Sequence, residues 1–227
     1  MSLYSVLSAL LDYPDAALLD ALPEIDAALA PSEEARQCLV PLISALKGRS
    51  LIESQEVYVA TFDRTPSHSL HLFEHVHGES RDRGPAMVDL LDEYRALGLE
   101  VASNELPDYV PLFLEVLGLV PPAKAQSLLD EAIHVLHAIG QRLANSGSEY
   151  AGVFEVLRGL ASVEPRPLTQ PPVRDMDEAL EIFGPGADGV EPLLAPSQAS
   201  AMKTIRFHPR SPASLGGQGA PTTKDAR

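Results

Sequence analysis

Histidine is concentrated in one short stretch of the 227-residue chain, where four of its seven histidines lie between His68 and His77. Two of them, His71 and His75, are four residues apart and would share one helical face, a spacing that binds zinc when a third ligand converges. The chain has no HExxH motif, and Cys38 is its only cysteine. Because apolar helical neighbours surround it, Cys38 is interpreted as a small core residue rather than a ligand or nucleophile.

Two Glu-x-x-His pairs suggest a second kind of metal chemistry. Glu74 and His77 form one pair, and Glu131 and His134 form the other. In ferritin-like di-iron bundles, two such pairs and two further glutamates bind the metals, because i, i+3 spacing points both side chains at one ion. Gly78 follows His77 directly, however, and places that histidine at a helix end. A metal-dependent helical enzyme is therefore kept as an alternative, while the favoured interpretation has neither a catalytic residue nor a metal or cofactor.

A charged loop with apolar neighbours follows the histidines. Acidic and basic residues alternate between Gly78 and Gly84, which fits either a solvated loop of weak ion pairs or a recognition loop whose arginines hold a carboxylate or phosphate. Apolar residues beside such a loop suit a groove for an amphipathic segment. The residues expected to form this binding surface are Phe62, Leu72, Phe73, Glu74, His75, Val76, His77, Glu79, Arg81, Asp82 and Arg83.

A second polar stretch runs from Glu105 to Tyr109 as Glu-Leu-Pro-Asp-Tyr. Pro107 suits the first turn of a helix, and Glu105 and Asp108 complement the positive end of the helix dipole. A structural helix cap explains these residues fully, so local geometry alone does not mark them as a binding site.

The formal net charge of −15 limits the classes of partner. Binding to nucleic acid needs clustered cations and is not expected, whereas a basic peptide or protein face would be attracted. The same charge would also simply keep a cytosolic protein in solution. Neither a signal peptide nor an apolar run long enough to span a bilayer is recognised, so a cytoplasmic protein without membrane insertion is expected.

The elements that must position these residues are helices. No window of apolar and polar alternation is long enough to indicate a strand, and the absence of Trp leaves a core of Leu, Val, Ile and Ala. Caps, proline and glycine stops and helical apolar spacing predict an all-α bundle of about eight helices. The segments with helical signals are 3–11, 15–30 (interrupted at Pro23), 32–48 (kinked at Pro41), 50–63, 65–78, 84–98, 107–118, 122–145 and 148–163.

The composition changes after Val163, since half of the 20 prolines lie from Glu164 onward. Residues 1–163 are expected to form one helical domain. Residues 164–227 are expected to be a mostly disordered, Pro/Gly-rich flexible tail that buries too little apolar surface to offset its ordering entropy. A short helix is predicted within this tail, at residues 175–183.

Several of these stretches resemble one family. The run from Phe73 to Gly84, with Ala86 to Leu91 after it, is similar to the NarJ-type assembly chaperones of respiratory nitrate reductase. The resemblance extends over roughly residues 3–163, and its other matching pieces are Leu11–Asp15, Phe62–Arg64 and Glu105–Asp108.

This resemblance implies a non-enzymatic helical chaperone of redox-enzyme maturation. It would bind the apo form of the catalytic alpha subunit of nitrate reductase and keep it competent for molybdenum cofactor insertion. Recognition would include the basic, amphipathic N-terminal segment of that subunit, which agrees with the acidic charge. A generic helical adaptor without maturation activity remains a further alternative.

The resemblance also implies that the stretch from Glu105 to Tyr109 belongs to the partner-binding surface. Glu105, Pro107 and Asp108 match a Glu-Pro-x-Asp-His-like motif of the wider chaperone group, while Leu106 replaces its usual first proline. Tyr109 stands where the motif has histidine, so a proton-dependent role of that histidine is not available to this chain. A peptide contact by the tyrosine ring and hydroxyl remains available.

Overall fold

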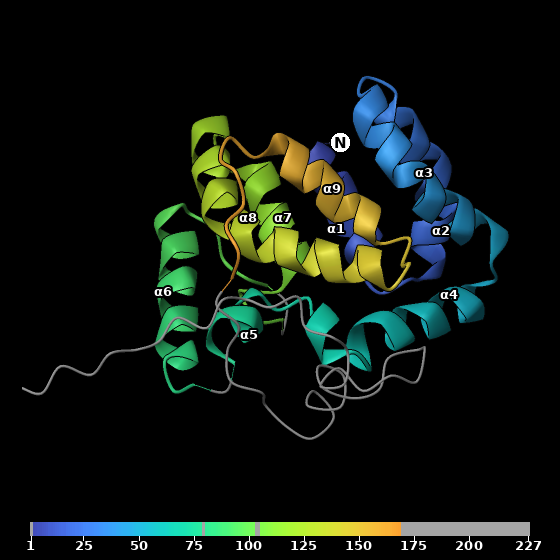
Figure 1. Cartoon of the computed structure of the whole chain (residues 1–227). Helices are drawn as coiled ribbons and strands as arrows, with labels where there is room; N and C mark the ends of the chain where they lie inside the picture. The colour runs from blue at the N-terminus through green and yellow to red at the C-terminus, as the bar shows by residue number, and fades with distance from the viewer. Residues whose placement is uncertain (1, 79, 103–104, 169–227) are drawn as a thin grey trace, which may run out of the picture. The chain divides into compact units, whose positions relative to one another are not determined.

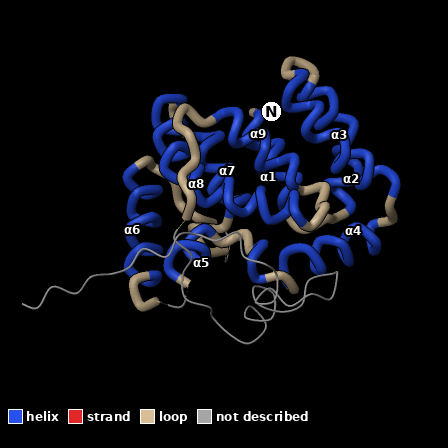
Figure 2. Tube along the Cα trace, in the orientation of Figure 1, coloured by secondary structure: helices blue, strands red, loops and turns tan. Residues whose placement is uncertain are grey.

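The computed structural model describes residues 2–78, 80–102 and 105–168. Within these residues the chain is helical and contains no strand, as Figure 2 shows; an isolated antiparallel bridge joins His71 to Tyr109. The predicted all-α class is confirmed. The α-helices are α1 Leu3–Leu11, α2 Ala16–Leu29, α3 Glu33–Gly48, α4 Leu51–Tyr58, α5 Leu72–His77, α6 Arg83–Ala96, α7 Val110–Leu119, α8 Pro122–Asn145 and α9 Ala151–Leu160.

Local capping explains where the first four helices begin. The side chains of Ser2, Asp15, Ser32 and Ser50 each accept a hydrogen bond from a backbone amide in the first turn of the helix that follows. Ser50 and Glu53 form the predicted reciprocal capping box. These starts are confirmed because each depends on residues within three positions of the cap.

The predicted interruption at Pro23 is wrong, because α2 continues through that proline. A proline inside a helix removes one backbone hydrogen bond and disfavours the helix by about 3 kcal/mol. Burial of Leu18 and Leu22 before the proline and of Ile25 and Leu29 after it offsets this loss. Tertiary packing therefore outweighs the local signal.

Two further boundaries differ from prediction because of one non-local contact. The predicted helix at 65–78 is replaced by a 3₁₀ turn, Pro66–His68, and the short helix α5. Between them Leu70 O accepts a hydrogen bond from Val110 N at 2.8 Å, and Leu72 N donates to Asp108 O at 3.1 Å. The same pairing delays the next helix, which begins at Val110 and not at Pro107.

The helix predicted at 50–63 ends where expected but changes its winding. Residues Val59–Asp63 form a π-helical turn after α4, closed by the hydrogen bond from Arg64 N to Val59 O at 3.0 Å. This turn leaves Phe62 buried beside Tyr58.

The long helix α8 lies at the centre of the fold and packs against α7 and α9, while α1 packs on α7 and α3 packs on α9 (Figure 1). The buried side of α8 includes the positions predicted from its apolar spacing, such as Leu129, Leu136 and Ile139. The short helix α5 also contacts α8, and α6 contacts α5. These contacts place the histidine-rich segment beside the central helix.

Beyond α9 the described chain continues to residue 168 and packs against α8. Ser162 N donates to Asp130 Oδ1 at 2.7 Å, and Leu168 packs against the hydrophobic core. The short helix predicted at 175–183 lies outside the described residues. None of the described helices is both long and apolar enough to cross a membrane.

Candidate partner-binding groove

The site is built on a buried carboxylate, Asp108, which is 0% exposed. One of its oxygens accepts a hydrogen bond from Phe73 N at 3.0 Å, and the other lies 3.2 Å from His71 Nδ1. The Asp108 side chain therefore supplies a hydrogen-bond acceptor for a backbone amide in the first turn of α5, which would otherwise have no partner within the helix. It joins the two polar stretches found in the sequence and fixes the orientation of α5.

Tyr109 extends this junction toward the N-terminal segment of the chain. Its ring lies 5.4 Å from the His71 ring, and its hydroxyl is 3.1 Å from that of Tyr58. Burial raises the pKa of Tyr109 to about 12, with Asp12 and Glu105 adding to the effect and the Tyr58 hydroxyl opposing it. The Tyr58 hydroxyl also lies 3.1 Å from Leu11 O, where it can donate a hydrogen bond.

Phe62 is buried in an aromatic cluster behind this junction. Its ring centroid lies 4.9 Å from that of Tyr58 and 4.9 Å from that of Tyr150. The predicted surface contact by Phe62 would thus require this cluster to open, because the side chain is only 6% exposed. In this structure Phe62 supports the site from within.

The predicted helical face shared by His71 and His75 does not form, because His71 precedes the helix. His75 is buried, with Nε2 2.8 Å from Ser69 O and Nδ1 2.9 Å from Arg142 Nη1. Since a carbonyl only accepts and a guanidinium only donates, these contacts fit a neutral ring protonated at Nε2. Arg142 of α8 thereby holds α5 in place.

The metal alternative gains no support from the described residues, which contain no group of three or more His, Cys, Asp or Glu able to hold an ion. Glu74 instead pairs with Arg83 at 3.2 Å, and the His77 ring packs edge-on against Phe73. In the other pair, His134 Nδ1 accepts a hydrogen bond from Arg166 N at 3.1 Å. The two Glu-x-x-His pairs are thus engaged separately.

A groove of about 350 Å³ opens between α5, α6, α7 and α8. The predicted residues Leu72, Phe73 and Val76 line it, and Val76 is 44% exposed. The rest of the lining was not selected as site residues in the sequence analysis. Its apolar members are Ala86, Leu90, Phe113, Leu128, Ala132 and Val135. Its acidic members are Asp89 and Glu93 of α6 and Glu131 of α8.

The charged loop lies at one end of this groove. Arg81 and Asp82 are exposed, whereas the Arg83 bridge to Glu74 connects the start of α6 to α5. Glu79 lies outside the described residues. At the other end of α6, Lys124 Nζ contacts Glu93 Oε1 at 2.6 Å, and Tyr94 Oη donates to Pro107 O at 2.9 Å. These three links hold α6 as a wall of the groove.

The missed groove residues had a weak signal in the sequence. The apolar spacing of Met87, Leu90, Leu91 and Tyr94 predicts an inward stripe for this helix, but only Tyr94 is fully buried, and Leu90 lines the groove instead. Glu131 and Ala132 belong to α8, 54 and 55 residues beyond His77, and nothing local connects them to the histidine-rich segment. Their i, i+3 and i, i+4 spacing to Leu128 and Val135 was the available clue.

Comparison with known proteins identifies the family. The family model described as "Nitrate reductase delta subunit" matches residues 16–155. The chain is 42% identical over 161 residues to the "Nitrate reductase molybdenum cofactor assembly chaperone NarJ" of Escherichia coli strain K12, an alignment covering 69% of this chain and 68% of the relative.

Two further relatives carry similar names. The "Probable nitrate reductase molybdenum cofactor assembly chaperone NarW" of Escherichia coli strain K12 is 38% identical, over 71% of this chain and 68% of the relative. The "Probable nitrate reductase molybdenum cofactor assembly chaperone NarJ" of Bacillus subtilis strain 168 is 30% identical, over 71% of this chain and 88% of the relative. On the matched residues and these identities, the chain belongs to the nitrate reductase delta subunit family.

Proposed function

We propose that this protein is a non-enzymatic chaperone for the assembly of nitrate reductase. It binds the apo catalytic alpha subunit in the cytoplasm and keeps it competent for molybdenum cofactor insertion. The names of the relatives support the chaperone role, and the groove between α5 and α8 supports a mechanism based on binding a segment of another protein.

The observation that carries the proposal is the combination of an apolar groove with an acidic rim. Leu72, Phe73 and Val76 offer apolar contact, while Asp89 and Glu131 contribute exposed carboxylates. A basic amphipathic helix matches both features, because its apolar face fills the groove and its cations meet the rim. The proposed occupant is the basic N-terminal segment of the alpha subunit.

The buried polar residues act by positioning the groove in this proposal. Asp108 and His71 fix the start of α5, and Arg142 holds the helix through His75. The bridge between Arg83 and Glu74 sets the spacing of α6 from α5. Such preorganisation lowers the entropy lost when a segment binds. Glu105 is exposed and adds negative potential near Tyr109.

A complementation experiment tests the chaperone function. Cells that produce the alpha subunit but lack their own delta-family chaperone would express this chain, and the molybdenum content and nitrate-reducing activity of the alpha subunit would be measured. The proposal expects both to rise well above those of cells without the chain. Binding of the alpha subunit without any rise in its molybdenum content would favour the adaptor alternative.

A further inference from the structure

Helix α8 has a second face whose chemistry is opposite to that of the groove. Positions His134, His137, Gln141 and Asn145 recur at helical spacing and form one stripe. Each of these side chains carries a group that can donate a hydrogen bond to an anion. The groove, by contrast, uses the separate stripe of α8 that contains Glu131.

The segment that follows α9 runs back over this donor stripe, and the orange segment in Figure 1 shows it crossing α8. Asp130 anchors its first part by accepting hydrogen bonds from both the amide and the hydroxyl of Ser162. His134 anchors its later part, because Nδ1 accepts from Arg166 N at 3.1 Å. Two tethers therefore hold the backbone of Arg166 at the edge of the stripe, where its side chain is exposed.

A pocket of about 310 Å³ lies between this segment and α8. Arg142, Arg166 and the four donors of the stripe line it, and none of its described lining residues is acidic. In a chain with 32 acidic and 17 basic residues, a cavity with two arginines and no carboxylate in its described lining has a charge opposite to that of the chain as a whole. The carboxylate of Glu155 lies in a neighbouring pocket that shares His137 and Gln141 with this one, and it pairs with Arg158 at 2.6 Å.

The donors of this pocket are partly preorganised. Arg142 Nη1 donates to Ser67 O at 3.2 Å, which limits the movement of the guanidinium. Because His134 Nδ1 accepts a hydrogen bond, the neutral ring carries its proton on Nε2 and presents it as a donor. Guanidinium and imidazole groups suit a tetrahedral oxyanion, which accepts several charge-assisted hydrogen bonds at once.

We propose that this pocket binds the phosphate group of a small molecule, as a phosphate monoester or a pyrophosphate. The pocket reaches the size at which small-molecule sites begin, about 300 Å³, so it can hold the phosphate together with part of its carrier. The site is separate from the partner groove, and its existence does not depend on the chaperone function.

Histidine ring resonances of the full chain provide the test. Inorganic phosphate and pyrophosphate would be added at constant ionic strength, with sodium chloride as the reference titration. The proposal expects saturable shifts of the His134 and His137 resonances that chloride does not produce. Arg166→Gln should weaken binding about tenfold, the effect of losing one charge-assisted hydrogen bond, and Arg166→Lys should retain part of it.

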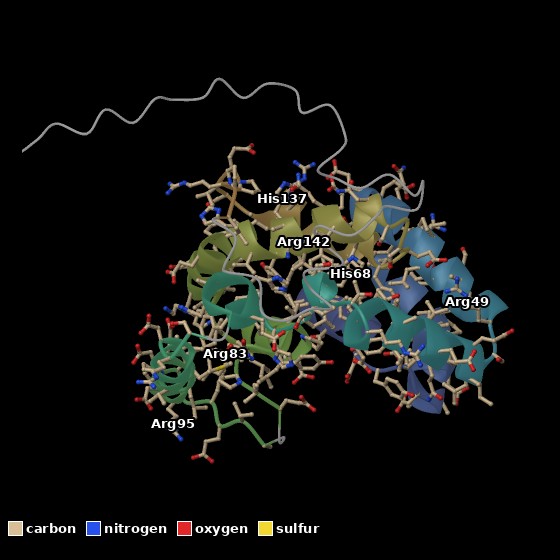
Figure 3. All side chains as sticks on the ribbon, turned by 60° about the horizontal axis from the view of Figure 1, so that its bottom comes forward. Arg49, His68, Arg83, Arg95, His137 and Arg142 are labelled. Carbon is tan, nitrogen blue, oxygen red and sulfur yellow. The ribbon has the colours of Figure 1, made fainter. Side chains whose placement is uncertain are left out.

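Arg95→Gln is the matched control, since it removes the same charge from an exposed site on α6. Figure 3 shows Arg95 far from His137 and Arg142, and its partner is Asp92 at 2.8 Å. Shifts that do not saturate, or equal affinities for the Arg166→Gln and Arg95→Gln proteins, would overturn the proposal. The proposal would also be overturned if the chain bound vesicles with anionic headgroups but did not respond to free phosphate or pyrophosphate.

Discussion

At the scale of single residues, the molecule uses its buried polar groups to shape a surface that they do not themselves reach. Asp108 is the clearest case, because the sequence resemblance placed it on the partner surface, while the structure buries it completely. Its carboxylate caps α5 across a sequence separation of 35 residues. No local pattern could have predicted that contact, since a helix cap for residues 107–118 explained the same residue equally well.

Replacing Asp108 should destabilise the fold. Asp108→Ala removes the acceptor of the Phe73 amide and should lower the free energy of unfolding by about 1–3 kcal/mol, the cost of leaving a buried donor unsatisfied. Asp108→Asn keeps one acceptor oxygen and should lose less. Urea denaturation measures both changes, with the exposed Asp92→Ala as control. Equal stabilities for the Asp108→Ala and Asp92→Ala proteins would refute the positioning role.

At the scale of elements, the accuracy of the sequence prediction depended on whether each signal was local. Helices with their own caps, such as those after Ser2 and Ser50, begin where predicted. The helix expected at 65–78 failed because residues near Leu70 pair with the chain at Val110. The places where two helices pack closely could also not be predicted from the sequence, because they depend on which glycine of one helix faces which neighbouring helix.

Gly152 is such a position, and it gives a prediction with a control in the same helix. A Cβ added there would overlap the carbonyl oxygen of Cys38 in α3, whereas one added at Gly159 would meet nothing. Gly152→Ala should lower the free energy of unfolding by about 1–3 kcal/mol through overpacking. Gly159→Ala should raise the free energy of unfolding by about 0.5–1 kcal/mol, because alanine has a higher helix propensity than glycine. Thermal unfolding distinguishes them, and a stabilised Gly152→Ala protein would show that α3 and α9 are not closely packed.

At the scale of the whole molecule, charge and apolar surface act together. The net charge of −15 attracts any basic partner over a distance limited by screening, about 8 Å at physiological ionic strength. That attraction alone does not select a binding place. In the proposed function the groove adds the selection, because it combines apolar lining with nearby carboxylates. The sequence predicted the wall formed by α5, and α6, α7 and α8 supply the rest of the lining.

The most direct test of this account is the affinity of the chain for the basic N-terminal segment of the alpha subunit, compared between two equally charged variants. Val76→Lys places a cation inside the groove, whereas Val88→Lys places one on the exposed face of α6, outside the groove lining. Both changes alter the net charge equally, so long-range attraction falls by the same amount.

Fluorescence titration of the labelled segment should show that Val76→Lys weakens binding at least about tenfold more than Val88→Lys does. The bound segment would cover the new cation in the apolar lining, and the cation would repel the basic residues of the segment. Circular dichroism would verify that both variants are folded. Equal affinities for the two folded variants would contradict the account, because the groove between α5 and α8 would then not be where the segment binds.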